Sequence, residues 1–89
     1  MDNYNILLAT YVKKCIFSNL KKIQYNDPKY NDIVKGGNII WHKYYKLVLN
    51  YEISYTFATN RLEIELKNNS DDIKYIQAYI DTFGKFWKV

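Results

Sequence analysis

Residues 39–57, IIWHKYYKLVLNYEISYTF, decide the predicted fold, because hydrophobic side chains occupy nearly every second position. One phase of the alternation reads Ile39, Trp41, Lys43, Tyr45, Leu47, Leu49, Tyr51, Ile53, Tyr55 and Phe57, with Lys43 as its one charged member. The other phase is mostly polar beyond Tyr44. Because successive side chains of a β-strand point to opposite faces, this period of two predicts a strand with one apolar and one polar face.

The alternation resumes after Thr59 and Asn60, in residues 61–67. If the chain reverses at Thr59 and Asn60, like side chains face each other across two strands. The predicted pairs are Phe57 with Leu62, Tyr55 with Ile64, Ile53 with Leu66, and Glu52 with Lys67. Such pairs stabilise an antiparallel sheet, and a slip of one residue would expose every apolar side chain. The sequence therefore predicts an antiparallel β-hairpin, or a three-stranded meander if the long segment bends at Asn50.

A helix is the alternative for the first half of this segment. Ile40, Tyr44, Leu47, Val48 and Tyr51 also form a stripe at helical spacing. Aromatic and β-branched side chains are enriched in strands, and this enrichment favours the strand.

Helices are predicted on both sides of the hairpin. Residues 3–24 have the apolar periodicity of an amphipathic helix. A short helix is predicted over residues 28–35, since Pro28 is typical of a first helical position and Gly36 of a stop. Ser70 predicts the N-cap of a last amphipathic helix, whose apolar side continues to Trp87.

These elements predict a single α+β domain over residues 1–89, in which two helices cover the apolar face of an antiparallel sheet. Hydrophobic residues make up 48% of the chain, which disfavours disorder. The single cysteine and the lack of a signal peptide predict a cytoplasmic protein. No apolar run reaches the ~18 residues of a membrane-spanning helix, so we expect no membrane partner.

Residues that usually carry catalysis are scarce. Cys15 is the one cysteine and His42 the one histidine, and they fall on different predicted elements. We expect Cys15 to be a buried thiol and His42 a surface imidazole. Glu63 and Glu65 are expected on the solvent face of the hairpin rather than as an acid–base or metal-binding pair. We therefore expect no enzyme activity, no cofactor and no metal site.

Tyrosines and lysines remain as candidate binding residues. The chain has ten tyrosines, and tyrosine offers a large, stiff contact area at protein interfaces. Base composition of an AT-rich genome explains the tyrosines equally well. Lys14 and Lys21 lie almost in line on the predicted first helix, away from its core face. The predicted partner-binding residues are Tyr4, Tyr11, Lys13, Lys14, Lys21, Lys22 and Tyr44.

The predicted function is stoichiometric binding by a small inhibitor or adaptor, whose partner is a protein or ribonucleoprotein. Anti-CRISPR and other anti-defence proteins of phages and mobile elements are examples of this type. A homo-oligomer is compatible with the same features. The alternative is an RNA- or DNA-binding module that uses the lysines of the first helix, which the net charge of +4 permits but does not require.

Overall fold

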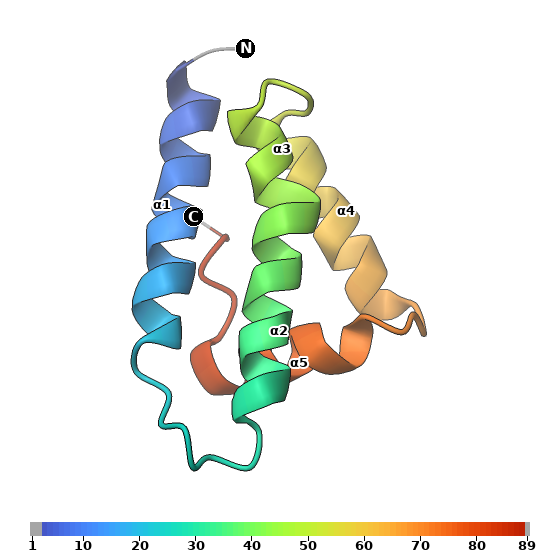
Figure 1. The fold of residues 1–89 in the computed structure, drawn as a ribbon. Helices are drawn as coiled ribbons and strands as arrows, with labels where there is room; N and C mark the ends of the chain where they lie inside the picture. Colours follow the sequence, from blue (N-terminus) through green and yellow to red (C-terminus); the bar gives the residue numbers. More distant parts are fainter. Residues whose placement is uncertain (1–2, 89) are drawn as a thin grey trace.

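The computed structural model describes residues 3–88, and all regular secondary structure in this range is helical (Figure 1). The elements are α1 (Asn3–Leu20), α2 (Tyr30–Ile40), the π-helical η1 (Trp41–Tyr45), α3 (Lys46–Leu49), α4 (Tyr55–Lys67) and α5 (Ile73–Phe83). Because α2, η1 and α3 follow one another without a break, the described chain forms four helical segments. The predicted α+β fold with a hairpin or meander is therefore wrong.

The long helix formed by α2, η1 and α3 replaces the first predicted strand. Its buried residues are Ile33, Gly36, Gly37, Ile40, Trp41, Tyr44, Tyr45 and Val48. The spacing between successive buried residues alternates between three positions and one. This is a helical pattern, and it begins before residue 39. Ile40 and Val48, which belong to the polar phase of the predicted strand, are fully buried. The helical alternative was thus the correct interpretation of this segment.

The π-helical turn of η1 explains how this spacing fits one helix face. Residues four apart drift by about 40° on an α-helix, because it has 3.6 residues per turn. The buried residues would therefore spiral away from the core. In η1 the N–H of Lys46 bonds to the carbonyl oxygen of Trp41, five residues earlier. This wider turn keeps Trp41, Tyr44 and Tyr45 on the core side.

Helix α4 occupies the positions of the predicted turn and second strand. Ser54 caps it, since its Oγ accepts a hydrogen bond from the Phe57 N–H at 3.1 Å. Tyr55, Ala58 and Leu62 are buried at helical spacing. Thr59 and Asn60, the predicted turn, lie inside this helix.

The remaining helices differ from their predicted bounds. Helix α1 ends at Leu20 instead of residue 24, and α2 continues through Gly36 instead of stopping there. Helix α5 has Asp72 rather than Ser70 at its N-cap, and it ends at Gly84, which has φ +80°. Trp87 lies beyond α5, in a C-terminal segment that returns to the core.

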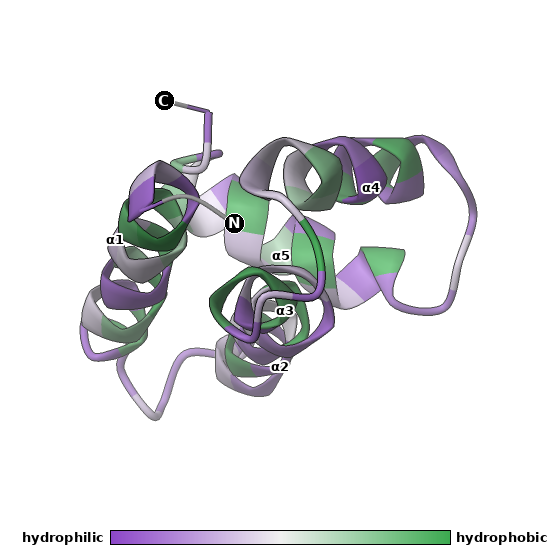
Figure 2. Cartoon of the chain, turned by 90° about the horizontal axis from the view of Figure 1, so that it is seen from above, coloured by the Kyte–Doolittle hydropathy of each residue, from purple (hydrophilic) through white to green (hydrophobic). Residues whose placement is uncertain are grey.

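The helices enclose one aromatic-rich core. Seen from above in Figure 2, α1 and α4 lie at different edges of the molecule, and α1 also contacts α4 directly through the hydrogen bond between Asn5 and Tyr55. The buried aromatic residues are Trp41, Tyr44, Tyr45, Tyr55, Tyr79 and Trp87. Four of the ten tyrosines therefore serve the core. Within residues 3–88, no helix is both long and apolar enough to cross a membrane.

Candidate protein-binding surface

The side of α1 that faces away from the core carries exposed apolar residues followed by exposed lysines. Tyr4, Leu7 and Tyr11 expose 67%, 66% and 46% of their surface. Lys14 continues this line on the helix, and Lys21 and Lys22 follow in the turn after it, all exposed. We call Tyr4, Leu7, Tyr11, Lys14, Lys21 and Lys22 the outer α1 face.

Contacts on the opposite side of α1 fix which residues point outward. Ala9, Val12 and Ile16 are fully buried. Two asparagines also tie the helix to its neighbours. Asn5 Oδ1 accepts a hydrogen bond from the Tyr55 N–H at 2.8 Å, and Asn19 Nδ2 donates to the Tyr79 hydroxyl at 3.0 Å. Rotation of α1 would break both bonds, so the outer α1 face is held toward solvent.

The positive charge of the outer α1 face is not neutralised. Residues 3–26 contain four lysines and no aspartate or glutamate. The remaining charges are nearly balanced, since residues 27–89 hold nine basic and eight acidic side chains. In the described part of the chain, the ion pairs involve Lys43, Lys85 and Lys88, and none involves a lysine of α1 or of the turn after it. The surface is therefore complementary to an anionic partner.

Lys13 differs from the other lysines of this region because it is half-buried. Its Nζ lies 5.9 Å from the centre of the Phe17 ring and 5.4 Å from that of Trp41, so aromatic faces hold the cation. A shallow hollow of about 400 Å³ adjoins it, lined by Thr10, Lys13, Lys14, Phe17, Ser18 and Lys21. Phe17, which lines this hollow, is 41% exposed.

The structure brings together most of the predicted site residues, but not all. Tyr4, Tyr11, Lys14, Lys21 and Lys22 lie on the outer α1 face, with Lys13 on its flank. Tyr44 was expected on the surface, and this is wrong: its side chain is 2% exposed and forms part of the core. The sequence showed Tyr44 in a stripe of apolar residues at helical spacing, but we predicted a strand for this segment.

Two residues were missed by the sequence prediction. Leu7 and Phe17 are exposed hydrophobic residues on α1. The helical wheel places Leu7 among the outward lysines, and that position was the available signal.

Tyr11 also contacts the chain's free cysteine. A hydrogen bond with Cys15 is the main cause that raises the pKa of the Tyr11 phenol. The sequence predicted that Cys15 is buried. In the structure it is only half-buried.

The carboxylates that the sequence placed on a hairpin stabilise helix packing instead. Glu63 accepts a hydrogen bond from Trp87 Nε1 at 3.2 Å and pairs with Lys85 Nζ at 3.1 Å. Glu65 pairs with Lys43 Nζ at 3.3 Å and accepts a hydrogen bond from Ser70 Oγ at 2.7 Å. Among residues 3–88, no three histidine, cysteine or acidic side chains gather as metal ligands would.

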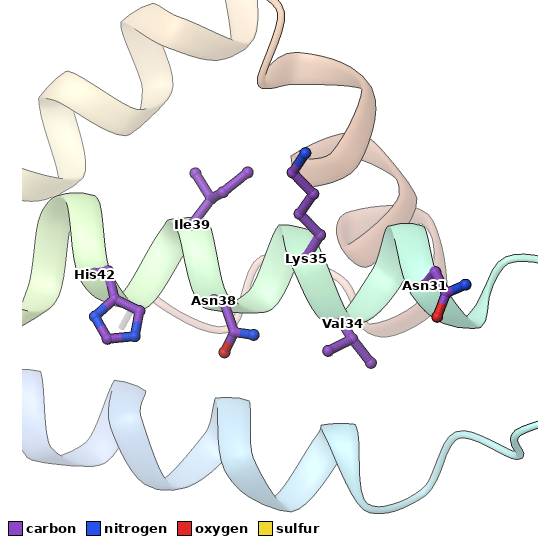
Figure 3. A pocket seen from close by; sticks show the side chains of 6 residues that line it. All are labelled: Asn31, Val34, Lys35, Asn38, Ile39 and His42. Carbon is purple, nitrogen blue, oxygen red and sulfur yellow. The ribbon is translucent and has the colours of Figure 1, made fainter.

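An open hollow along the long helix contains the one histidine. It has a volume of about 390 Å³ and is lined by Asn31, Val34, Lys35, Asn38, Ile39 and His42. Figure 3 shows that these side chains project to different sides of the helix and do not converge on one point. His42 and Lys35, the two titratable residues of this lining, project to opposite sides of the helix.

Comparison of the chain with protein-family models, with curated proteins and with solved structures finds no match.

Proposed function

We propose that this chain is a non-catalytic cytoplasmic protein that binds a protein or ribonucleoprotein partner through the outer α1 face. The observation that carries the proposal is the exposure of Tyr4, Leu7 and Tyr11 in line with lysines that have no acidic neighbour on the helix. Exposed hydrophobic residues that adjoin one another are typical of interaction sites.

The chemistry of this face suits a protein partner. Tyrosine supplies stiff contact area with a polar tip, and exposed leucine gains free energy when a partner covers it. Lys14 and Lys21 would steer an acidic partner toward the surface and fix its register. The apolar half is then the main source of affinity, and the basic half a source of specificity and association rate.

The biological role we propose is that of a stoichiometric inhibitor or adaptor. The small size of the chain and the exposed residues of the outer α1 face support this role. Anti-defence proteins of phages and mobile elements, anti-CRISPR proteins among them, act in this way, and we place the chain in that functional type.

Nucleic-acid binding is the second candidate, and the hollow beside Lys13 favours it. An exposed aromatic ring, here Phe17, can stack on a base while neighbouring lysines contact phosphates. Lys14 and Lys21 line the same hollow.

Capture from the native host separates the two candidates. The tagged protein would be purified with and without nuclease, and the affinity for the captured partner measured at several salt concentrations. We expect a protein that stays bound after nuclease treatment, with an affinity that falls little with salt. A steep linear fall of log affinity with log salt would instead identify phosphate contacts and contradict protein binding.

Matched variants localise the contact. We expect Tyr4→Ala with Leu7→Ala to weaken binding by about tenfold or more, as for truncation of interface anchors. Lys14→Gln with Lys21→Gln should have the smaller effect. Tyr25→Ala is the control, since Tyr25 is 87% exposed but lies in the connection after α1. Equal effects of the control and the apolar variant would exclude the outer α1 face.

A further inference from the structure

The exposed side of α4 carries a second group of residues with the composition of an interface. Phe57, Arg61 and Ile64 lie on one face of the helix, because they are four and three residues apart. Phe57 exposes 50% and Ile64 56% of its surface, and Arg61 is exposed as well. Aromatic residues and arginine are enriched where protein partners bind.

A small pocket adjoins this side of α4. It has a volume of about 140 Å³ and is lined by Lys43, Tyr44, Leu47, Ile53, Phe57 and Arg61. Leu47, Ile53 and Phe57 give it apolar walls, and Tyr44 and two cationic side chains complete the lining. Its size and lining suit one aliphatic side chain of a partner, the usual form of an interface anchor.

The two cations of this pocket differ in their partners. Lys43 Nζ lies 3.3 Å from carboxylate oxygens of both Glu65 and Asp72, so two acidic side chains already more than offset its charge. Arg61 has no carboxylate partner among residues 3–88, and its guanidinium carbon lies 5.9 Å from the centre of the Phe57 ring. An unpaired guanidinium beside an apolar pocket is complementary to a carboxylate next to an aliphatic group.

The backbone of Tyr51, in the connection that leads into α4, is strained. This tyrosine is 67% exposed and has φ +62°. The N–H of Tyr51 bonds to the Val48 carbonyl oxygen and that of Glu52 to the Leu47 carbonyl oxygen, the pattern of a Schellman C-cap. Glycine is favoured at this left-handed position, so an exposed tyrosine there costs stability.

We infer that Phe57, Arg61 and Ile64, with the pocket beside them, form a second protein-binding surface, which we call the α4 surface. The partner segment it fits is acidic and amphipathic: an aliphatic side chain enters the pocket, and a carboxylate pairs with Arg61. The α4 surface and the outer α1 face belong to different helices (Figure 2) and share no residue. A protein with both surfaces can bridge two partners, and the inference does not depend on the function proposed for α1.

A designed peptide pair tests the chemistry of the α4 surface. The probe is an amidated, alanine-rich helical peptide with one leucine and, four residues later, one glutamate; the control peptide has glutamine instead. Binding to the ¹⁵N-labelled full-length chain is followed by NMR. We expect shifts of the signals of Phe57, Arg61 and Ile53, and binding of the glutamate peptide about two- to fivefold tighter, as for one partly exposed charge pair.

Matched variants decide whether Arg61 is responsible. Arg61→Gln should remove the preference for glutamate, while Lys67→Gln, which removes the same charge from an exposed position of α4, should keep it. Tyr4→Ala with Leu7→Ala should leave peptide binding unchanged.

Several results would overturn the inference. These are the absence of binding, equal affinity for both peptides, a preference that survives Arg61→Gln, and shifts confined to α1. Concentration-dependent shifts of the α4 surface without peptide would identify a second copy of the chain as the occupant and reject the partner we infer. Failure of this test leaves the function proposed for the outer α1 face unaffected.

Discussion

The carbonyl oxygen of Tyr75 in α5 lies so close to Gly36 in α2 that a Cβ atom on residue 36 would fall 2.0 Å from it. The backbones of α2 and α5 therefore meet at a point where no side chain fits. At the next residue, Gly37, a Cβ atom would lie 3.2 Å from side-chain atoms of Leu20 and Tyr79. Side chains can shift by a few tenths of an ångström more readily than a helix backbone can.

Gly36→Ala should destabilise the protein, because α2 and α5 must move apart to admit the methyl group. We expect a loss of about 1–3 kcal/mol in the free energy of unfolding, despite the better helix propensity of alanine. Urea unfolding followed by circular dichroism measures it. Gly37→Ala is the matched control and should cost clearly less. A Gly36→Ala protein as stable as the wild type would contradict the close approach.

Trp87 should be a major contributor to stability although it lies outside every helix. It is 1% exposed, its Nε1 donates to Glu63, and its carbonyl oxygen accepts a hydrogen bond from the Tyr55 hydroxyl. We expect Trp87→Ala to cost about 3–5 kcal/mol, as for other buried aromatic residues, and Trp87→Phe to cost less because it fills most of the same space. Equilibrium denaturation gives both values; a near-neutral Trp87→Ala would show that the C-terminal segment is not part of the core.

Stability should fall in acid because of Glu63 and Glu65. Burial acts to raise the pKa of Glu63, but hydrogen bonds from Lys85 and Trp87 outweigh it and lower the pKa. The hydrogen bond from Ser70 is the main cause that lowers the pKa of Glu65, against a smaller effect of burial. A lowered carboxyl pKa stabilises the fold above the pKa of the unfolded chain, and this contribution is lost as the pH falls through the folded-state value.

The measurement is thermal unfolding of Glu63→Gln and Glu65→Gln across the acidic pH range. Each variant should be less stable than the wild type near neutral pH, and the difference should vanish in acid. Asp71→Asn is the control, since Asp71 is exposed and forms no ion pair within the described residues. A pH-independent difference would show that the carboxylate charge is not responsible.

Tyr51→Gly should stabilise the protein. The left-handed conformation at this position costs a residue with a side chain about 1–2 kcal/mol, and glycine avoids most of that cost. We expect a gain of about 1 kcal/mol for Tyr51→Gly in denaturant unfolding. Tyr51→Ala, which keeps a Cβ atom, should show no such gain. Equal stability of the glycine and alanine variants would refute the strain.

The sequence predicted the first helix and its orientation well, because its apolar residues recur at a regular helical period and its lysines fall on the opposite side. Five of the seven predicted contact residues lie on the outer α1 face as a result. The central segment failed because its alternating steps of three and one repeat every four residues, a period longer than the 3.6 residues per turn of a regular α-helix. The sequence from Ile33 onward, rather than from Ile39, shows this four-residue repeat of apolar and glycine positions. It does not show the π-helical turn that keeps these positions on one face of the helix.

What the sequence determined by itself is the amphipathic character of the first and last helices and the unbalanced charge of residues 3–26, both of which depend on neighbours within a few turns. The tertiary structure decided the rest. Gly36 continues a helix instead of ending it because α5 packs against its bare backbone, and Tyr44 is buried because η1 turns it inward. Trp87 joins the core because Tyr55 and Glu63 bind it there. Each of these outcomes depends on a contact between residues distant in the chain, whose free energy exceeds the local preferences that the sequence displays.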